Sequence, residues 1–226
     1  MVTVKIDGVA KTYPKGTTFE TIAKEYQEAY DGMIALVMEN AKIRELFRTV
    51  NKDCELSFIT FRDSIGHKTY VRTALMTLVK AAYDVLGEEK IHKLKVEFAI
   101  GKGYYLDVRM EEQLTDEMVK QINKRMHEIV EEDIPIIKKS YPVEEARAMF
   151  REHNMLDKDK LFKYRRSSSV NVYSIDGYKD YYYGYMLPST GYLKYFDVMH
   201  YESGILLLIP GKEEPDKIAY FQPREK

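Results

Sequence analysis

The sequence is short of several features that mark whole classes of protein. Its 226 residues contain no tryptophan and one cysteine, and a single cysteine excludes an internal disulfide. The single thiol, Cys54, fits a small buried residue in a protein of the reducing cytoplasm. No apolar run approaches the ~20 residues that a membrane-spanning helix needs, and the first residues lack the layout of a signal peptide. We therefore expect a cytoplasmic protein with no membrane association.

An excess of positive charge is also missing. Lysine and arginine total 35 against 36 aspartate and glutamate, which leaves a net charge of −1. Proteins that bind nucleic acid mainly through phosphates usually carry a basic excess, so the charge balance weighs against that class. A local basic patch remains open around Lys160, Lys163, Arg165 and Arg166.

Two common site motifs are absent as well. No GxxxxGK[ST] phosphate loop occurs, and in the segment that begins Gly101-Lys102-Gly103 the third glycine position is Leu106. The five histidines show no ligand spacing and are His67, His92, His127, His153 and His200. We therefore expect no bound metal.

The first 62 residues alternate strands with one helix. Val2, Val4 and Ile6 form a half-buried strand, Asp7-Gly8 is a hairpin turn, and a second strand runs over 9–13. A helix over about 18–30 follows, with Thr17 as its expected cap, and then strands over 34–38 and 56–61. This is the order of the ubiquitin-like β-grasp fold.

The remaining residues predict a mixed α+β unit. Arg62–Thr69 is short and polar, and we expect it to separate two neighbouring domains, 1–62 and 63–226. Apolar periodicity predicts helices over 71–86, 114–132 and 143–152, with Gly87 ending the first, Thr115 capping the second and Pro142 starting the third. Strands are expected within 98–108, at 134–139 and at 204–209, and 157–166 is expected to be a charged surface segment.

Tyrosines gather in one late stretch. Seven of the nineteen fall between Tyr178 and Tyr195, among glycines and a proline that predict two short strands and a loop. Such phenols can line a concave site that stacks on a ring and hydrogen-bonds its edges. The alternative is the aromatic face of an ordinary sheet.

Two segments of the chain resemble known domains. The stretches VKIDGVAKTYPKGTTFETIA and IRELFRTVNKDCELSFIT resemble a TGS domain, the module at the N-terminus of threonyl-tRNA synthetases and in some GTPases. The later residues GYYLDV at 103–108, LT at 114–115, KRMHE at 124–128, KK at 138–139 and EEAR at 144–147 are similar to the second, editing-type domain of threonyl-tRNA synthetase, which alanyl-tRNA synthetase shares. The resemblance implies a TGS-like domain followed by an editing-like α+β domain.

The resemblance also implies where an editing site would lie. In threonyl enzymes an HxxxH pair on a helix and a distant Cys and His hydrolyse mischarged tRNA, and these positions fall on Met76, Lys80, Tyr182 and Met186. None of the four keeps its chemistry, because a thioether, an ammonium and a phenol cannot replace imidazole as zinc ligand or base. We therefore expect no editing activity and no metal.

The same span is similar to the N-terminal half of bacterial nucleoside kinases of the uridine kinase type. The loss of the editing residues and the charged stretch after Pro210 fit that arrangement, so the leading interpretation is a non-catalytic, ligand-binding or regulatory half. It implies a kinase domain that follows as partner, with ATP and Mg²⁺ bound there and no cofactor in this part. The alternatives are a tRNA-binding fragment of a threonyl-tRNA synthetase, a related RNA-binding module, and a structural platform.

A refitted pocket is the most specific expectation. Arg72, Met76 and Lys80 lie four residues apart along one helix flank, which we expect to face Tyr182–Met186 across a cleft. Methionines would line the bottom of the cleft, tyrosines would line its sides and two cations would lie beside it. Such a cleft suits a nucleotide or nucleoside. The candidate ligand-binding residues are Arg72, Met76, Lys80, Tyr104, Tyr105, Tyr182, Tyr183 and Met186. The alternative is a filled cavity in which tyrosines pack on the methionines.

Overall fold

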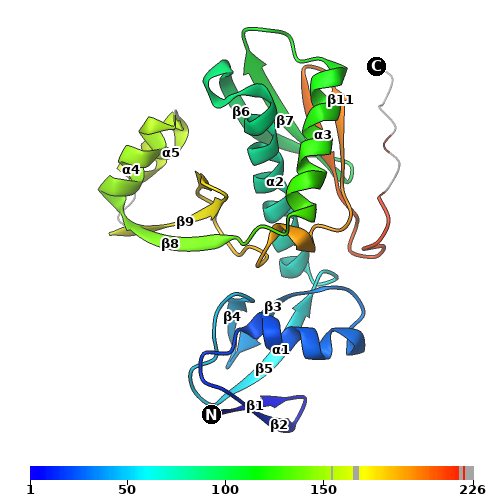
Figure 1. The fold of residues 1–226 in the computed structure, drawn as a ribbon, viewed down its shortest axis with the longest axis vertical. Coiled ribbons are helices and arrows are strands. Elements are labelled where there is room, and N and C mark those ends of the chain that lie inside the picture. The colour runs from blue at the N-terminus through cyan, green and yellow to red at the C-terminus, as the bar shows by residue number, and fades with distance from the viewer. Residues whose placement is uncertain (154, 165–167, 219–220, 222–226) are drawn as a thin grey trace.

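The computed structural model describes residues 1–153, 155–164, 168–218 and 221. It is an α+β fold with three sheets, which confirms the predicted fold class. Figure 1 shows the first sheet and helix α1 at one end of the molecule, α2 and α3 side by side at the other, and α4 and α5 on a lateral arm.

The first sheet has the predicted β-grasp arrangement. Its strands are β1 (Val2–Ile6), β2 (Val9–Tyr13), β3 (Ile34–Glu39), β4 (Lys42–Glu45) and β5 (Cys54–Thr60), in the order β2-β1-β5-β3-β4. Only β1 and β5 pair in parallel. Helix α1 (Phe19–Tyr26) continues into the 3-10 helix η1 (Gln27–Ala29) and buries Phe19, Ile22 and Ala23 in the core of this sheet. The N-cap is Thr18 rather than Thr17, because the Thr18 hydroxyl accepts the Thr21 N–H.

The prediction that residues 62–69 form a linker is wrong. Helix α2 (Ser64–Leu86) begins there, directly behind β5, and Gly87 ends it as predicted. Asp63 precedes the helix and accepts the Thr60 N–H at 2.7 Å. Gly66 lies so close to that strand end that an added Cβ would stand 1.9 Å from the Thr60 oxygen. The glycine therefore permits close packing in this segment and does not mark a loop.

The second sheet carries the largest core. It is formed by β6 (Ile91–Ile100), β7 (Gly103–Met110), β11 (Asp197–Tyr201) and β12 (Gly204–Leu208), in the order β11-β12-β7-β6. Helices α2 and α3 (Asp116–Glu131) cover one face of it, and Thr115 caps α3 as predicted. The short 3-10 helix η2 (Glu88–Lys90) connects α2 to β6.

The third sheet and two helices form the lateral arm. The sheet contains β8 (Ile137–Pro142), β9 (Ser169–Ile175) and β10 (Tyr178–Asp180), and the helices are α4 (Val143–Glu152) and α5 (Leu156–Lys163). Pro142 is the N-cap of α4 rather than its first residue. The charged segment expected on the surface is helical through Lys163, while Arg165 and Arg166 of the expected basic patch lie outside the described residues.

The tyrosine-rich stretch holds one short strand, not two. After β10 the chain leaves the sheet, and its next regular element is the 3-10 helix η3 (Thr190–Tyr192). Among the described residues, no helix is both long and apolar enough to cross a membrane.

Candidate functional site

The flank of α2 that carries Arg72 lies against the loop after β10. Arg72 reaches Gly184 and donates from Nη1 to the Tyr185 carbonyl at 3.5 Å. Gly184 has φ +125°, and an added Cβ would lie 2.5 Å from the Arg72 guanidinium carbon. Burial lowers the pKa of Arg72, although the phenols of Tyr173 and Tyr185 oppose that shift.

The floor of the expected cleft is filled. Met76 and Met186 are both 0% exposed and pack in one cluster with Ile136, Tyr173 and Ile175. Because both thioethers are fully buried among apolar side chains, they form core rather than the wall of an open pocket.

Lys80 does not offer a free charge. Its side chain is buried, with 8% of the residue exposed, and Nζ lies 2.6 Å from Asp84 Oδ1. Asp84 also pairs with Arg125 at 3.0 Å, and Asp176 lies 3.9 Å from the lysine. The expected role of Lys80 as a phosphate ligand is therefore not supported, since its ammonium is already neutralised.

Asp180 organises the tyrosines on either side of it. This carboxylate is 4% exposed, pairs with Lys158 of α5 at 2.5 Å, and accepts hydrogen bonds from the Tyr178 hydroxyl and the Tyr181 N–H. Burial, and then the charge of Asp180, raise the pKa of Tyr182 well above its ordinary value. The cluster ties α5 to the end of β10.

A second buried carboxylate joins the first sheet to the arm. Glu45, at the end of β4, is 3% exposed and accepts hydrogen bonds from Tyr173 at 2.5 Å and Lys138 at 3.0 Å. The Met186 N–H also points at Glu45, at 3.4 Å. Burial, followed by the hydrogen bond to Glu45, raises the pKa of Tyr173. Sequence reasoning missed both Glu45 and Asp180, because nothing local distinguishes them from surface acids.

An open hollow remains on the outer side of the loop. It encloses about 240 Å³ between β9, α5 and the loop, and it includes two of the predicted phenols, Tyr182 and Tyr183. Tyr183 is 79% exposed, whereas Tyr181 stands edge-on to Phe162 at 4.7 Å between ring centres. The full lining is Lys138, Phe162, Ser169, Val170, Asn171, Tyr173, Tyr181, Tyr182, Tyr183 and Gly184.

The other two predicted phenols lie in the second sheet. Tyr104 packs against the core beneath α2 and α3. Tyr105 belongs to a cluster on the opposite face, where it stacks on Phe98 at 5.1 Å. Neither lines the hollow at Tyr183, so the structure does not bring all eight candidate residues together.

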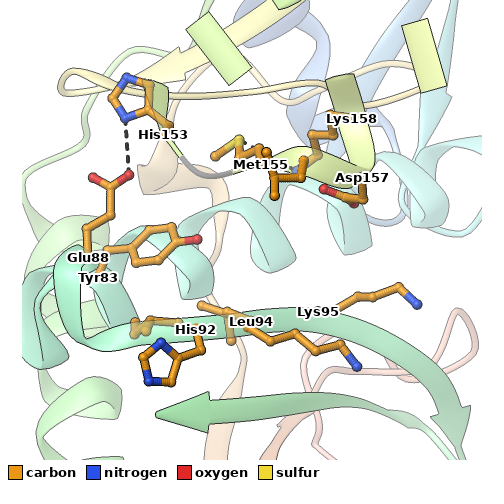
Figure 2. A pocket seen from close by; sticks show the side chains of 12 residues that line it. Tyr83, Glu88, His92, Leu94, Lys95, His153, Met155, Asp157 and Lys158 are labelled. Atoms are coloured by element: carbon orange, nitrogen blue, oxygen red, sulfur yellow. Dashed lines mark hydrogen bonds and ion pairs between the residues drawn. The ribbon is translucent and has the colours of Figure 1, made fainter. Parts of the chain in front are cut away.

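A further hollow separates the arm from the second sheet. It encloses about 260 Å³, and Figure 2 shows Tyr83 pointing between the strand of Leu94 and the helix of Asp157. His153 and Glu88 close one side with a contact of 3.1 Å. Burial is the main reason that the pKa of Tyr83 rises to about 12.

The residues that the structure describes contain no group of three or more His, Cys, Asp or Glu side chains that could hold a metal ion. Positions 76, 80, 182 and 186 converge on the α2 flank and the facing loop, but their chemistry is that of packing and ion pairing.

Comparison with known proteins identifies threonine–tRNA ligases as relatives. The chain is 31% identical over 196 residues to the enzyme of Thermotoga petrophila, which covers 85% of the chain and 29% of the enzyme. Threonine–tRNA ligase 1 of Bacillus subtilis is 30% identical over 198 residues, covering 85% and 30%, and the enzyme of Desulforamulus reducens is 28% identical over 199 residues, covering 88% and 31%. No family model matches the chain.

These relatives overturn the kinase interpretation. The prediction that the chain is the N-terminal half of a nucleoside kinase, with a kinase domain as its partner, is wrong, because the relatives are named as tRNA ligases. The matches span about three tenths of the length of these enzymes. Over 85% of its length, the chain is similar to part of threonine–tRNA ligase, and its α+β fold is consistent with a TGS-like and editing-like arrangement.

Proposed function

We propose that this chain is a tRNA-binding module related to the corresponding part of threonine–tRNA ligase, and that it does not deacylate tRNA. The observation that carries the proposal is the likeness to tRNA ligases over 85% of the chain. We further propose residues 1–62 and 63–226 as its two domains. The first sheet uses residues 2–60, and α2 begins at Ser64, close to that boundary.

The lack of hydrolysis follows from the side chains at the inherited positions. Deacylation needs a base or a metal to activate water, and Met76 and Met186 supply neither. Both are also sealed from water, since each is 0% exposed. The Lys80 ammonium is held in an ion pair with Asp84 at 2.6 Å, which leaves it turned toward that carboxylate rather than toward a substrate.

The hollow beside Tyr183 is the proposed RNA contact. RNA-binding proteins commonly stack unpaired bases on aromatic rings and guanidinium planes, and each stacked base contributes about 1–3 kcal/mol. Tyr183 presents a largely exposed ring at the mouth of the hollow, and Tyr182 lines it. Lys160 and Lys163 lie on the adjacent helix α5, and no ion pair is found for either within the described part of the chain.

Binding to labelled tRNA, followed by fluorescence anisotropy at low salt, tests the proposal. Tyr183→Ala should weaken binding by about tenfold, the value expected for the loss of one stacked base. Phe98→Ala is the matched control, because Phe98 is likewise an aromatic ring that is more than half exposed, but it lies on the outer face of the second sheet. Affinity should fall with salt, as for phosphate contacts.

Two results would overturn it. Absence of tRNA binding at tens of micromolar protein and low salt would remove the RNA proposal, and equal losses in the two variants would remove the assigned surface. Deacylation of mischarged tRNA above the buffer rate would show that the inherited site still hydrolyses its substrate.

A further inference from the structure

A groove far from the tyrosine loop runs between α1 and the segment that carries η3. Its larger part encloses about 500 Å³, within the range of small-molecule sites. A second hollow of about 190 Å³ continues it and shares Met33, Tyr192 and Lys194 with the first. The groove is therefore elongated, and these three side chains mark its middle.

The walls of the groove are held by their own hydrogen bonds. The Tyr192 hydroxyl donates to Glu20 at 3.0 Å, and Lys24 neutralises the same carboxylate at 2.8 Å. Gln27 donates to the Gly32 carbonyl and accepts the Ile34 N–H at 2.8 Å. Since segments far apart in the chain fix both sides, the groove is preformed and needs no ligand to build it.

Most of the groove's surface is apolar. Ala23, Met33 and Ile34 line the larger hollow, and Phe61 and Tyr70 line the smaller one. The polar wall groups named above are already hydrogen-bonded to one another. A ligand would therefore gain mainly from burying its own apolar body.

Lys194, at the middle of the groove, differs from these paired polar groups. It is exposed, and within the described part of the chain no carboxylate lies within ion-pair distance of its ammonium. Asp133 lines the larger hollow and Asp216 the smaller one, so negative charge is disfavoured in both arms of the groove. Lys24 also lines the larger hollow, but it is paired with Glu20, so an anionic group is favoured beside Lys194.

We propose that this groove is a ligand site for an elongated apolar monoanion, an aromatic or aliphatic carboxylate or sulfonate. The apolar body lies along Met33 and Tyr192, and the anionic group meets Lys194. The site is independent of RNA binding, because it shares no lining residue with the hollow at Tyr183.

The test uses 8-anilinonaphthalene-1-sulfonate, an apolar monoanion, with the whole chain. The protein has no tryptophan, so probe fluorescence can be excited without indole emission. Saturable binding is expected, and Lys194→Gln should weaken it by about threefold to fivefold, as for one exposed ion pair. Lys15→Gln, an exposed lysine in the first sheet's turn, should leave it unchanged.

A methyl-labelled methionine spectrum gives the location. Titration with 2-naphthoate to millimolar concentration should shift the Met33 methyl resonance, assigned with Met33→Leu, and leave those of buried Met76 and Met186 in place. An unmoved Met33 resonance, or equal binding by the two lysine variants, would overturn the site. A dimer by light scattering that dissociates in Met33→Glu would also overturn it, because a second copy would then cover the groove.

Discussion

The two sides of the Tyr181–Met186 loop differ sharply in packing. Toward α2, Met186 meets Met76 in a sealed cluster with Tyr173 beneath it. Away from α2, Tyr183 is 79% exposed beside an open hollow. Met186 therefore belongs to the core on one side of the loop, while Tyr183 presents an exposed ring on the other. One loop can contribute to the core and to the surface at once, because successive side chains point in different directions.

Removal of the Glu45 carboxylate should give the largest loss on the packed side. Glu45→Ala leaves Lys138 mostly buried without its partner at 3.0 Å, and breaking such a pair costs about 3–5 kcal/mol of unfolding free energy. Urea unfolding measures the loss. The double variant Glu45→Met, Lys138→Met should stay much closer to the original stability. An equal loss in the double variant would mean that packing, and not the unpaired charge, carries the effect.

A cavity in the same cluster should cost somewhat less. Met76→Ala removes a fully buried side chain and should lower the unfolding free energy by about 2–5 kcal/mol. Tyr183→Ala, on the open side of the loop, should change it by less than about 0.5 kcal/mol. Similar losses of unfolding free energy in the two variants would show that the two sides of the loop do not differ in packing.

The contact between Arg72 and Gly184 gives a smaller effect. Gly184→Ala combines a strained φ of +125° with a Cβ that would stand 2.5 Å from the guanidinium, so about 1–3 kcal/mol should be lost. Gly177→Ala is the matched control, because its φ is +81° and an added Cβ would meet nothing within 4 Å. Adding Arg72→Ala should recover stability in the Gly184 variant only. No recovery in the Gly184 variant would place the strain in the backbone alone.

Alkaline pH should give the smallest effect, through Tyr182, which lies between the two sides of the loop. The pKa of Tyr182 is raised by burial and by Asp180, so the folded state resists an ionisation that the unfolded chain undergoes near pH 10. The stabilising contribution is complete below pH 10 and falls as pH rises above it. Unfolding measured at pH 9 and 11 should show a smaller decline for Tyr182→Phe than for the original chain. Parallel declines would assign the effect to other groups.

Local patterns were enough for much of the fold. The alternation at Val2, Val4 and Ile6, the Asp7-Gly8 turn and the cap at Thr115 report on neighbouring residues, and the structure has each element there. Strand β4 and helix α5 were missed, because short charged segments carry little periodicity. The start of α2 was missed because Gly66 serves a contact with β5.

Only part of the candidate site could be predicted from the sequence. Helical spacing placed Arg72 and Met76 on one flank, and the resemblance set that flank against Tyr182 and Met186. It could not reveal that Asp84 neutralises Lys80, or that Tyr105 lies in a different cluster. Whether a buried position is cavity or core depends on the volumes of all its neighbours, which no single segment encodes.

The sequence alone determined that positions 76, 80, 182 and 186 carry no imidazole or thiolate, because the residues there are Met76, Lys80, Tyr182 and Met186. It also determined the β-grasp order through local alternation and turns. Only the tertiary structure decided which charged side chains are paired with each other. Glu45 meets Lys138 across 93 residues, and Lys158 meets Asp180 across 22. Ion pairs at such separations form because folding brings distant elements together, and nothing near a carboxylate in the sequence identifies its partner beforehand.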